Sequence, residues 1–220
     1  MSAVTPGPSA GPMAGLRLAQ LYVLSRRVPV ALAAIAVSAV ALWTALHWRW
    51  TAYGAFQLPL IFEAACATVV AATTASPFGE PERAAGRQLP WLRLGTALAL
   101  TAAAAVALAA AGIGTDLAGG ILEMVRNLIG LTGIGLLCAA LLGAALAWTA
   151  PAAYLLVAVY ALYTRWHGPA LTGPWIWPAQ PLHDISAAAC AGLVFIAGLA
   201  VFALRGARNV DPDGGSSDSH

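Results

Sequence analysis

The chain has 220 residues, of which 60% are hydrophobic and 9% are charged. A soluble domain of this size does not need so much apolar surface, so the composition indicates a polytopic helical membrane protein. All eleven basic residues are arginines, which excludes a P-loop lysine, a Schiff-base lysine and a Ser–Lys dyad. The net charge of +2 is spread over several loops and does not indicate nucleic-acid binding.

The N-terminal part of the chain divides into two segments. Residues 1–15 are rich in Pro, Gly and Ser, which predicts disorder. Leu16–Arg27 combines apolar residues with three arginines, which is typical of an amphipathic helix at the membrane surface; a frayed basic leader is the alternative interpretation.

Six apolar segments follow, and together with the leader they make residues 16–206 a single all-α domain, a membrane helical bundle of about six transmembrane helices. Most are about 19 residues or longer, enough to cross about 30 Å of hydrocarbon. Residues 207–220 are polar and predicted to be a disordered tail. The predicted spans are Val28–Leu46, Leu58–Ser76, Leu94–Gly114, Leu128–Trp148, Pro151–Tyr163 and Ile185–Leu204.

The segment before the fourth span has a different pattern. Asp116–Asn127 carries apolar residues at helical spacing on one face, with Glu123 and Arg126 as an i,i+3 pair on the other. This pattern predicts a short interfacial helix. The fourth span itself has small residues every four positions, which favours close helix packing within the bundle or in a dimer. These residues are Gly135, Ala139, Gly143 and Ala147.

The distribution of arginines predicts the orientation in the membrane. Six spans place both termini on one side together with the loop between spans two and three. Eight arginines then lie on that side and three on the other: Arg17, Arg26, Arg27, Arg83, Arg87, Arg93, Arg205 and Arg208, against Arg49, Arg126 and Arg165. The positive-inside rule therefore predicts cytoplasmic termini and a multi-pass protein of the cytoplasmic membrane.

Glu63 is the one carboxylate in the second span. Burying a carboxylate in a membrane is costly, so such a residue is a functional candidate. It could bind a cationic group, carry a proton, or hold a neighbouring span through a hydrogen bond. A structural pairing, for example with Arg49, remains the alternative to a role in a transport path.

Metal, cofactor and enzyme sites are not indicated. His167, His183 and Asp184 share the long loop before the last span, but their spacing fits no zinc signature. The motifs of common hydrolase, redox and dinucleotide sites do not occur. The three cysteines lie in three different spans, which favours packing over a disulfide framework; they are Cys66, Cys138 and Cys190.

The most charged interval between the first and last spans is Ser76–Leu94. Pro77 ends the second span, and acidic residues after it favour the start of a short helix. Such a helix could insert into a groove on a partner ATPase, and an ordinary solvated loop is the alternative. The residues predicted to contact the partner are Pro77, Phe78, Gly79, Glu80, Glu82, Arg83 and Arg87.

The six spans, basic leader, charged loop and semi-embedded outer loop resemble the membrane subunits of type-2 ABC exporters. The stretches at 76–94 and 126–137 are similar to actinobacterial proteins regarded as ABC permease-like. The resemblance implies a homo- or heterodimeric permease driven by a separate ATP-binding subunit. It also implies that Pro77–Arg87 is a coupling helix and Leu16–Arg27 a connecting helix. At 220 residues the chain is small for such a subunit.

Two other classes of function remain open. One is an accessory or regulatory membrane protein that binds a partner without transporting. The other is a membrane-embedded enzyme that acts on lipid through Glu63 or through the loop with His167, His183 and Asp184. The sequence does not specify a cargo, although spans this apolar would suit a hydrophobic one.

Overall fold

The structure, a computed structural model, describes residues 28–48, 57–73, 89–115, 120–163, 173–181 and 183–205. Every regular element in these ranges is helical, which confirms the predicted all-α class. The elements are α2 (Val28–His47), α3 (Gln57–Thr73), α5 (Leu89–Gly112), α6 (Gly120–Leu142), the 3-10 helix η3 (Ala144–Leu146), α7 (Thr149–Tyr163), the 3-10 helix η4 (Trp177–Ala179) and α8 (Ile185–Arg205). The predicted leader, the loop at 77–87 and the terminal segments at 1–15 and 207–220 lie outside the described residues.

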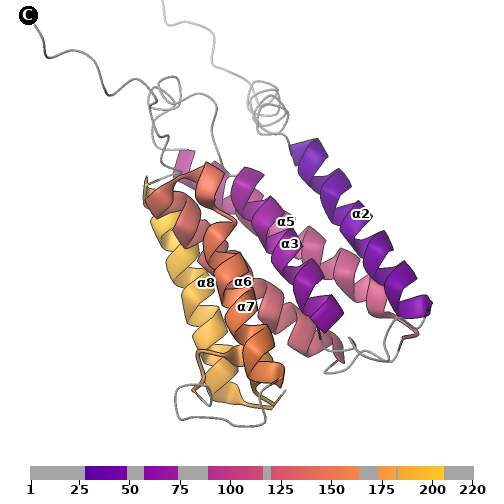
Figure 1. Cartoon of the computed structure of the whole chain (residues 1–220). Helices are drawn as coiled ribbons and strands as arrows, with labels where there is room; N and C mark the ends of the chain where they lie inside the picture. Colours follow the sequence, from indigo (N-terminus) through magenta and orange to yellow (C-terminus); the bar gives the residue numbers. More distant parts are fainter. Residues whose placement is uncertain are drawn as a thin grey trace, which may run out of the picture.

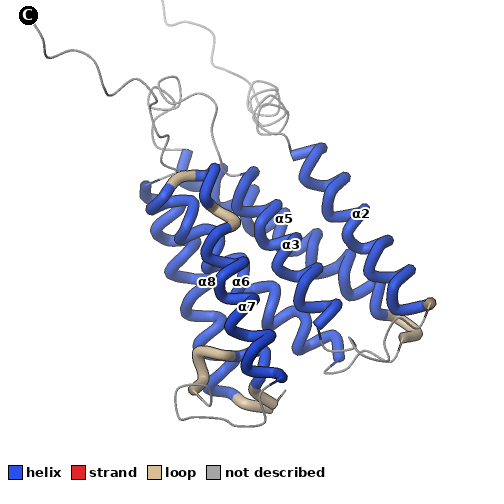
Figure 2. The backbone as a smooth tube through the Cα atoms, in the orientation of Figure 1, coloured by secondary structure: helices blue, strands red, loops and turns tan. Residues whose placement is uncertain are grey.

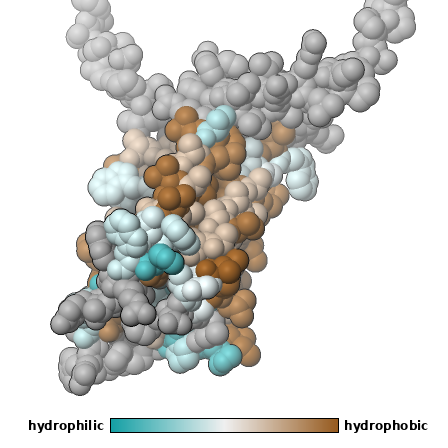
Figure 3. All heavy atoms as spheres, turned by 90° about the vertical axis from the view of Figure 1, so that its right-hand side faces the viewer, coloured by the Kyte–Doolittle hydropathy of each residue, from teal (hydrophilic) through white to brown (hydrophobic). Residues whose placement is uncertain are grey.

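Five helical segments among the described residues are long and apolar enough to cross a membrane, as expected for a membrane protein. They are Val28–His47, Pro90–Gly112, Gly120–Leu142, Ala144–Tyr163 and Ile185–Arg205. The apolar helix α3 is shorter, with 17 residues and a length of about 26 Å. Large apolar side chains also cover the outside of the bundle, as on α2, and Figure 3 shows apolar residues along the middle of one side. A surface of this kind suits contact with lipid.

The long helices run alternately up and down the bundle (Figures 1 and 2). The first residue of α2 and the last residue of α8 therefore lie at the same end, which we call the terminal end. The connection from α3 to α5 starts and finishes there too. The opposite end, which we call the loop end, carries the connections from α2 to α3, from α5 to α6 and from α7 to α8.

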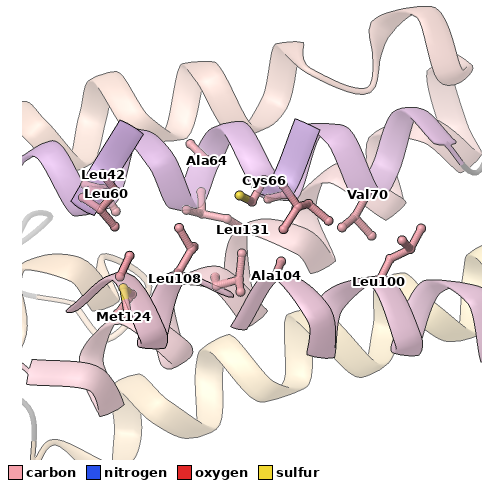
Figure 4. Packing of buried hydrophobic residues seen from close by; sticks show 14 of the residues in the cluster. Leu42, Leu60, Ala64, Cys66, Val70, Leu100, Ala104, Leu108, Met124 and Leu131 are labelled. Carbon is pink, nitrogen blue, oxygen red and sulfur yellow. The ribbon is translucent and has the colours of Figure 1, made fainter. Parts of the chain in front are cut away.

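The largest apolar core lies between α2, α3, α5 and α6 (Figure 4). Leu42, Leu108 and Leu131 come from three different helices and are fully buried in it. Alanines fill much of the remaining interior, so the helices approach each other closely. The most buried of the long helices is α6, which contacts all the others except α2 extensively.

The closest approach of two helices is between α6 and α8. A Cβ atom added to Gly198 would lie 2.5 Å from the carbonyl oxygen of Gly133, and one added to Gly133 would lie 2.6 Å from the backbone of Phe195. Only glycine fits at both positions without moving the helices. The helix α6 is unbroken at Gly133, so this glycine serves a tight contact between helices.

The predicted boundary before the fourth span is wrong. Instead of a short interfacial helix at 116–127 followed by a span at 128–148, one continuous helix runs from Gly120 to Leu142. The helix begins earlier because its polar residues find partners inside the protein and need not stay at the surface. It ends earlier because Gly143 has a φ of 99°, a backbone conformation that side chains other than glycine rarely adopt.

The four small residues of the predicted packing ridge are therefore divided by this bend. Gly135 and Ala139 lie on α6, while Gly143 forms the bend and Ala147 follows η3. Ala139 and Ala147 are buried together with Ala71 of α3. Small residues thus do meet in the interior of the bundle, with α3 as the partner, although not along one helix.

Candidate functional site

A cluster of polar side chains, all buried except the partly exposed Glu123, lies between α3 and α6. Its members are Glu63 on α3 and Glu123, Arg126 and Asn127 on α6, and we call them the polar cluster. Glu63 is the seventh residue of α3 and Asn127 the eighth of α6. Because both helices start at the loop end, the cluster lies roughly 10 Å inside the bundle from that end.

Arg126 holds the segment between α7 and α8 against the bundle. Its Nη2 donates hydrogen bonds to the carbonyl oxygens of Trp177 at 2.6 Å and Gln180 at 3.2 Å, and its Nη1 donates to the carbonyl of Pro181 at 3.1 Å. The side chain is 8% exposed. A cation beside the free carbonyls at the end of a helical turn is a favourable arrangement, so Arg126 acts as a clamp on residues 177–181.

The clamped segment inserts an indole ring into the bundle. Trp177 is buried and stacks on Tyr154 of α7 with ring centroids 4.6 Å apart. The Tyr154 hydroxyl donates to the carbonyl of Trp175 at 2.9 Å. A Cβ atom on Gly130 would overlap the indole, so a glycine one turn after Arg126 is what lets the ring lie flat against α6. The segment therefore closes the loop end of α6, α7 and α8.

Glu63 lies on the α3 side of the cluster and is 1% exposed. The Asn127 side chain is its hydrogen-bonding neighbour, and Arg126 and Glu123 are close enough to act on it electrostatically. Among the described residues no ion pair to Glu63 is formed, because Arg126 directs its donors to the backbone carbonyls and lies 3.8 Å from a Glu123 oxygen. Arg49, the pairing partner considered from the sequence, lies outside the described residues.

Several polar atoms of this region are buried without a partner. Within the described part of the chain they include Oε2 of Glu63, Nε of Arg126, Oδ1 of Asn127, Oγ1 of Thr132 and Nε1 of Trp177. Buried polar groups in proteins are nearly always hydrogen-bonded. An accumulation of unsatisfied groups inside a membrane bundle therefore marks a place where a proton, a water or another ligand could bind.

The sequence singled out Glu63 but missed its surroundings. The sequence places Arg126 on the polar face of an interfacial helix that ends at Asn127, whereas both residues are buried. A usable signal was present, because Asn127 and Glu63 fall at the same depth of two neighbouring helices. What hydropathy could not provide was the set of carbonyls that satisfies Arg126, which comes from more than 50 residues away.

Asp184, a metal-ligand candidate from the sequence, has a structural role at the start of α8. Its Oδ1 accepts hydrogen bonds from the Ser186 hydroxyl at 2.6 Å and from the backbone N–H groups of Ser186 and Ala187 at 2.8 and 3.3 Å. These bonds, with the hydroxyl bond first, hold the pKa of Asp184 below its ordinary value. Asp184 is thus the N-cap of α8. His183 is exposed, and His167 lies outside the described residues.

The described residues contain no group of three or more His, Cys, Asp or Glu side chains that could hold a metal ion. The predicted partner contacts at 77–87 fall outside this part of the chain, and only the flanking residues Thr73 and Leu89 are described.

Comparison of the chain with models of protein families, with curated proteins and with solved structures gives no match.

Proposed function

We propose that this chain is the membrane-spanning permease subunit of an ABC-type export complex in the cytoplasmic membrane. In this proposal six helices span the membrane and both termini face the cytoplasm. A separate ATP-binding subunit docks on residues 77–87 and drives transport. Because the chain has no lysine, it cannot carry a complete P-loop, and ATP hydrolysis belongs to that partner.

The observation that carries the proposal is the alternating direction of the helices. It puts the connection between α3 and α5 at the same end of the bundle as the first residue of α2 and the last residue of α8. The charged residues of the connection and the basic residues beyond both terminal helices then share one side of the membrane. Such a side is the cytoplasmic one by the positive-inside rule and is where a soluble ATPase would bind.

The packing offers a path for movement from the connection to the other end of the bundle. Residues 74–88 join α3 directly to α5, and α3 packs against α6. Close to the terminal end, the Cβ of Ala71 would lie 2.9 Å from a Cβ atom on Gly135. Nearer to the loop end, Glu63 meets Asn127. A displacement of α3 would therefore act on α6 and, through Arg126, on the segment that closes the loop end.

The second permease chain would pack on the apolar outer surface of the bundle. Exposed valines, leucines and tryptophans occur on α2, α5, α7 and α8, and either lipid or a second helical bundle could cover them. A homodimer and a heterodimer both satisfy this proposal.

The test is purification of the tagged full-length chain from its host in mild detergent, with mass spectrometry of the proteins that co-purify. We expect an ATP-binding ABC subunit. It should be lost when Glu82 and Arg83 are both changed to Ala, and retained when Arg208 and Asp211 are changed to Ala. The second variant is a matched control, because it removes the same two charges from the predicted tail. Recovery of membrane proteins alone would contradict the proposal and favour an accessory membrane protein without transport activity.

A further inference from the structure

Two buried oxygen atoms that lack donors belong to neighbouring side chains on α3 and α6. Oε2 of Glu63 and Oδ1 of Asn127 have no hydrogen-bond partner among the described residues. The two side chains are 1% and 5% exposed, so water does not cover them. Each is an acceptor, and two buried acceptors next to each other without a donor are unfavourable. One additional hydrogen atom between Oε2 of Glu63 and Oδ1 of Asn127 would satisfy both oxygens.

The charges around the pair do not supply this hydrogen. Among the described residues Arg126 is the cation that acts on Glu63, but its Nη atoms donate to the carbonyls of residues 177, 180 and 181, and its Nε has no hydrogen-bond partner. Glu123, which lies on α6 like Arg126, is a second carboxylate and acts on Glu63 electrostatically. Two carboxylates therefore face one guanidinium, none of whose N–H groups donates to Glu63 or Asn127. The remaining titratable neighbour is Cys66, one turn along α3, which is also fully buried.

We propose that Glu63 is a proton-binding site in the interior of the bundle, occupied as the neutral acid with its O–H directed to Oδ1 of Asn127. Binding requires only the transfer of one proton from water to the carboxylate. The protonated oxygen becomes a donor, the amide oxygen gains its partner, and both unsatisfied atoms are explained together. This inference does not depend on an ATP-binding partner.

A proton suits the site better than a metal cation. Calcium and magnesium take about six or more oxygen ligands, whereas the polar cluster offers few, and no group of three or more acidic, histidine or cysteine side chains occurs in the described part of the chain. A proton needs one donor position and one acceptor, which Glu63 and Asn127 provide.

Release of the proton would change the contact between α3 and α6. The charged carboxylate has to be hydrated or paired, and neither is available while both side chains stay buried. Deprotonation would therefore favour a state in which α3 and α6 separate at this level and water enters. Because Arg126 precedes Asn127 on α6, such a movement would also reach the clamped segment at 177–181.

The experiment is infrared difference spectroscopy of the purified full-length chain in lipid vesicles, recorded as the pH is changed around neutrality. We expect the C=O stretching band of a protonated carboxyl group at neutral pH. The band should be absent in Glu63→Gln, shifted in frequency in Asn127→Leu, and unchanged in the matched control Glu123→Gln. If Glu63→Gln does not fold, Glu63→Asp keeps an acid at this position and should move the band rather than remove it.

Two results would overturn the proposal. One is a wild-type spectrum without a protonated carboxyl band at neutral pH, which would mean that Glu63 is ionised and paired with a cation. The other is a band that persists in Glu63→Gln and disappears in Glu123→Gln, which would assign the proton to Glu123. Neither result bears on whether an ATPase docks at 77–87, so failure here is distinguishable from failure of the proposed function.

Discussion

The clamp formed by Arg126 can be tested by changing this residue to Met, which keeps most of the side-chain length and removes the charge and the donors. Three hydrogen bonds to backbone carbonyls are lost. At the average of about 0.6 kcal/mol for hydrogen bonds inside membrane proteins they would contribute about 2 kcal/mol. At about 1.5 kcal/mol each, the lower value for bonds to charged groups, the sum is about 4.5 kcal/mol.

We therefore expect Arg126→Met to lower the free energy of unfolding by about 2–4 kcal/mol, since one guanidinium makes all three bonds and their effects are not independent. The measurement is SDS-driven unfolding in mixed micelles, followed by circular dichroism. The free energy of unfolding of Arg126→Lys should lie between those of Arg126→Met and the wild type, because lysine keeps the charge but not the planar fork of donors. The matched control is Arg205→Met, at an exposed position at the end of α8, which should have little effect.

A local readout separates the clamp from general stability. In Arg126→Met, amide hydrogen exchange should accelerate over 173–181 before it does so in the middle of α6. If Arg126→Met unfolds with the same free energy as Arg205→Met, and exchange over 173–181 is unchanged, Arg126 is not a clamp.

Three further predictions concern the backbone and the cap. Gly198→Ala should destabilise the bundle by about 1–3 kcal/mol, because the new Cβ would lie 2.5 Å from the Gly133 carbonyl oxygen. Gly143→Ala should cost about 1–2 kcal/mol in the same unfolding assay, because a φ of 99° is unfavourable for alanine. The pKa of Asp184 is lowered in the folded protein, so its charged cap stabilises α8 at pH values above the ordinary pKa of 3.8. This stabilisation is lost as the pH falls through the folded-state pKa. The variant Asp184→Asn, which also caps a helix, should remove this part of the acid sensitivity.

Each of these predictions has a control or an outcome against it. Gly192→Ala on α8 and Gly95→Ala on α5 are matched controls, because nothing lies within 4 Å of a Cβ atom at either position; both should be neutral or slightly stabilising. Equal stability of Gly198→Ala and Gly192→Ala would mean that α6 and α8 do not pack as described. For Asp184, an acid unfolding profile identical to that of the Asn variant would contradict its role as the cap.

The sequence by itself determined the class of protein and the positions of most helices. The start of α2 and of α8 is predicted to the residue, and the end of α7 at Tyr163 also agrees. These boundaries are local properties, since an apolar run bounded by arginine, proline or tryptophan has the same meaning in any fold. Glu63 was found for the same reason, because a carboxylate within an apolar run stands out without knowledge of its neighbours.

Only the tertiary structure decided what happens between residues 116 and 151. A polar stretch such as Glu123–Asn127 belongs at a surface unless partners are available inside, and hydropathy does not reveal partners. Here the carbonyls of residues 177, 180 and 181 accept hydrogen bonds from the Nη atoms of Arg126, and Glu63 on α3 meets Asn127. Such contacts join residues that are more than 50 positions apart in the chain. They make a predicted surface helix the first turns of the most buried long helix, because the cost of burying a charge depends on what surrounds it.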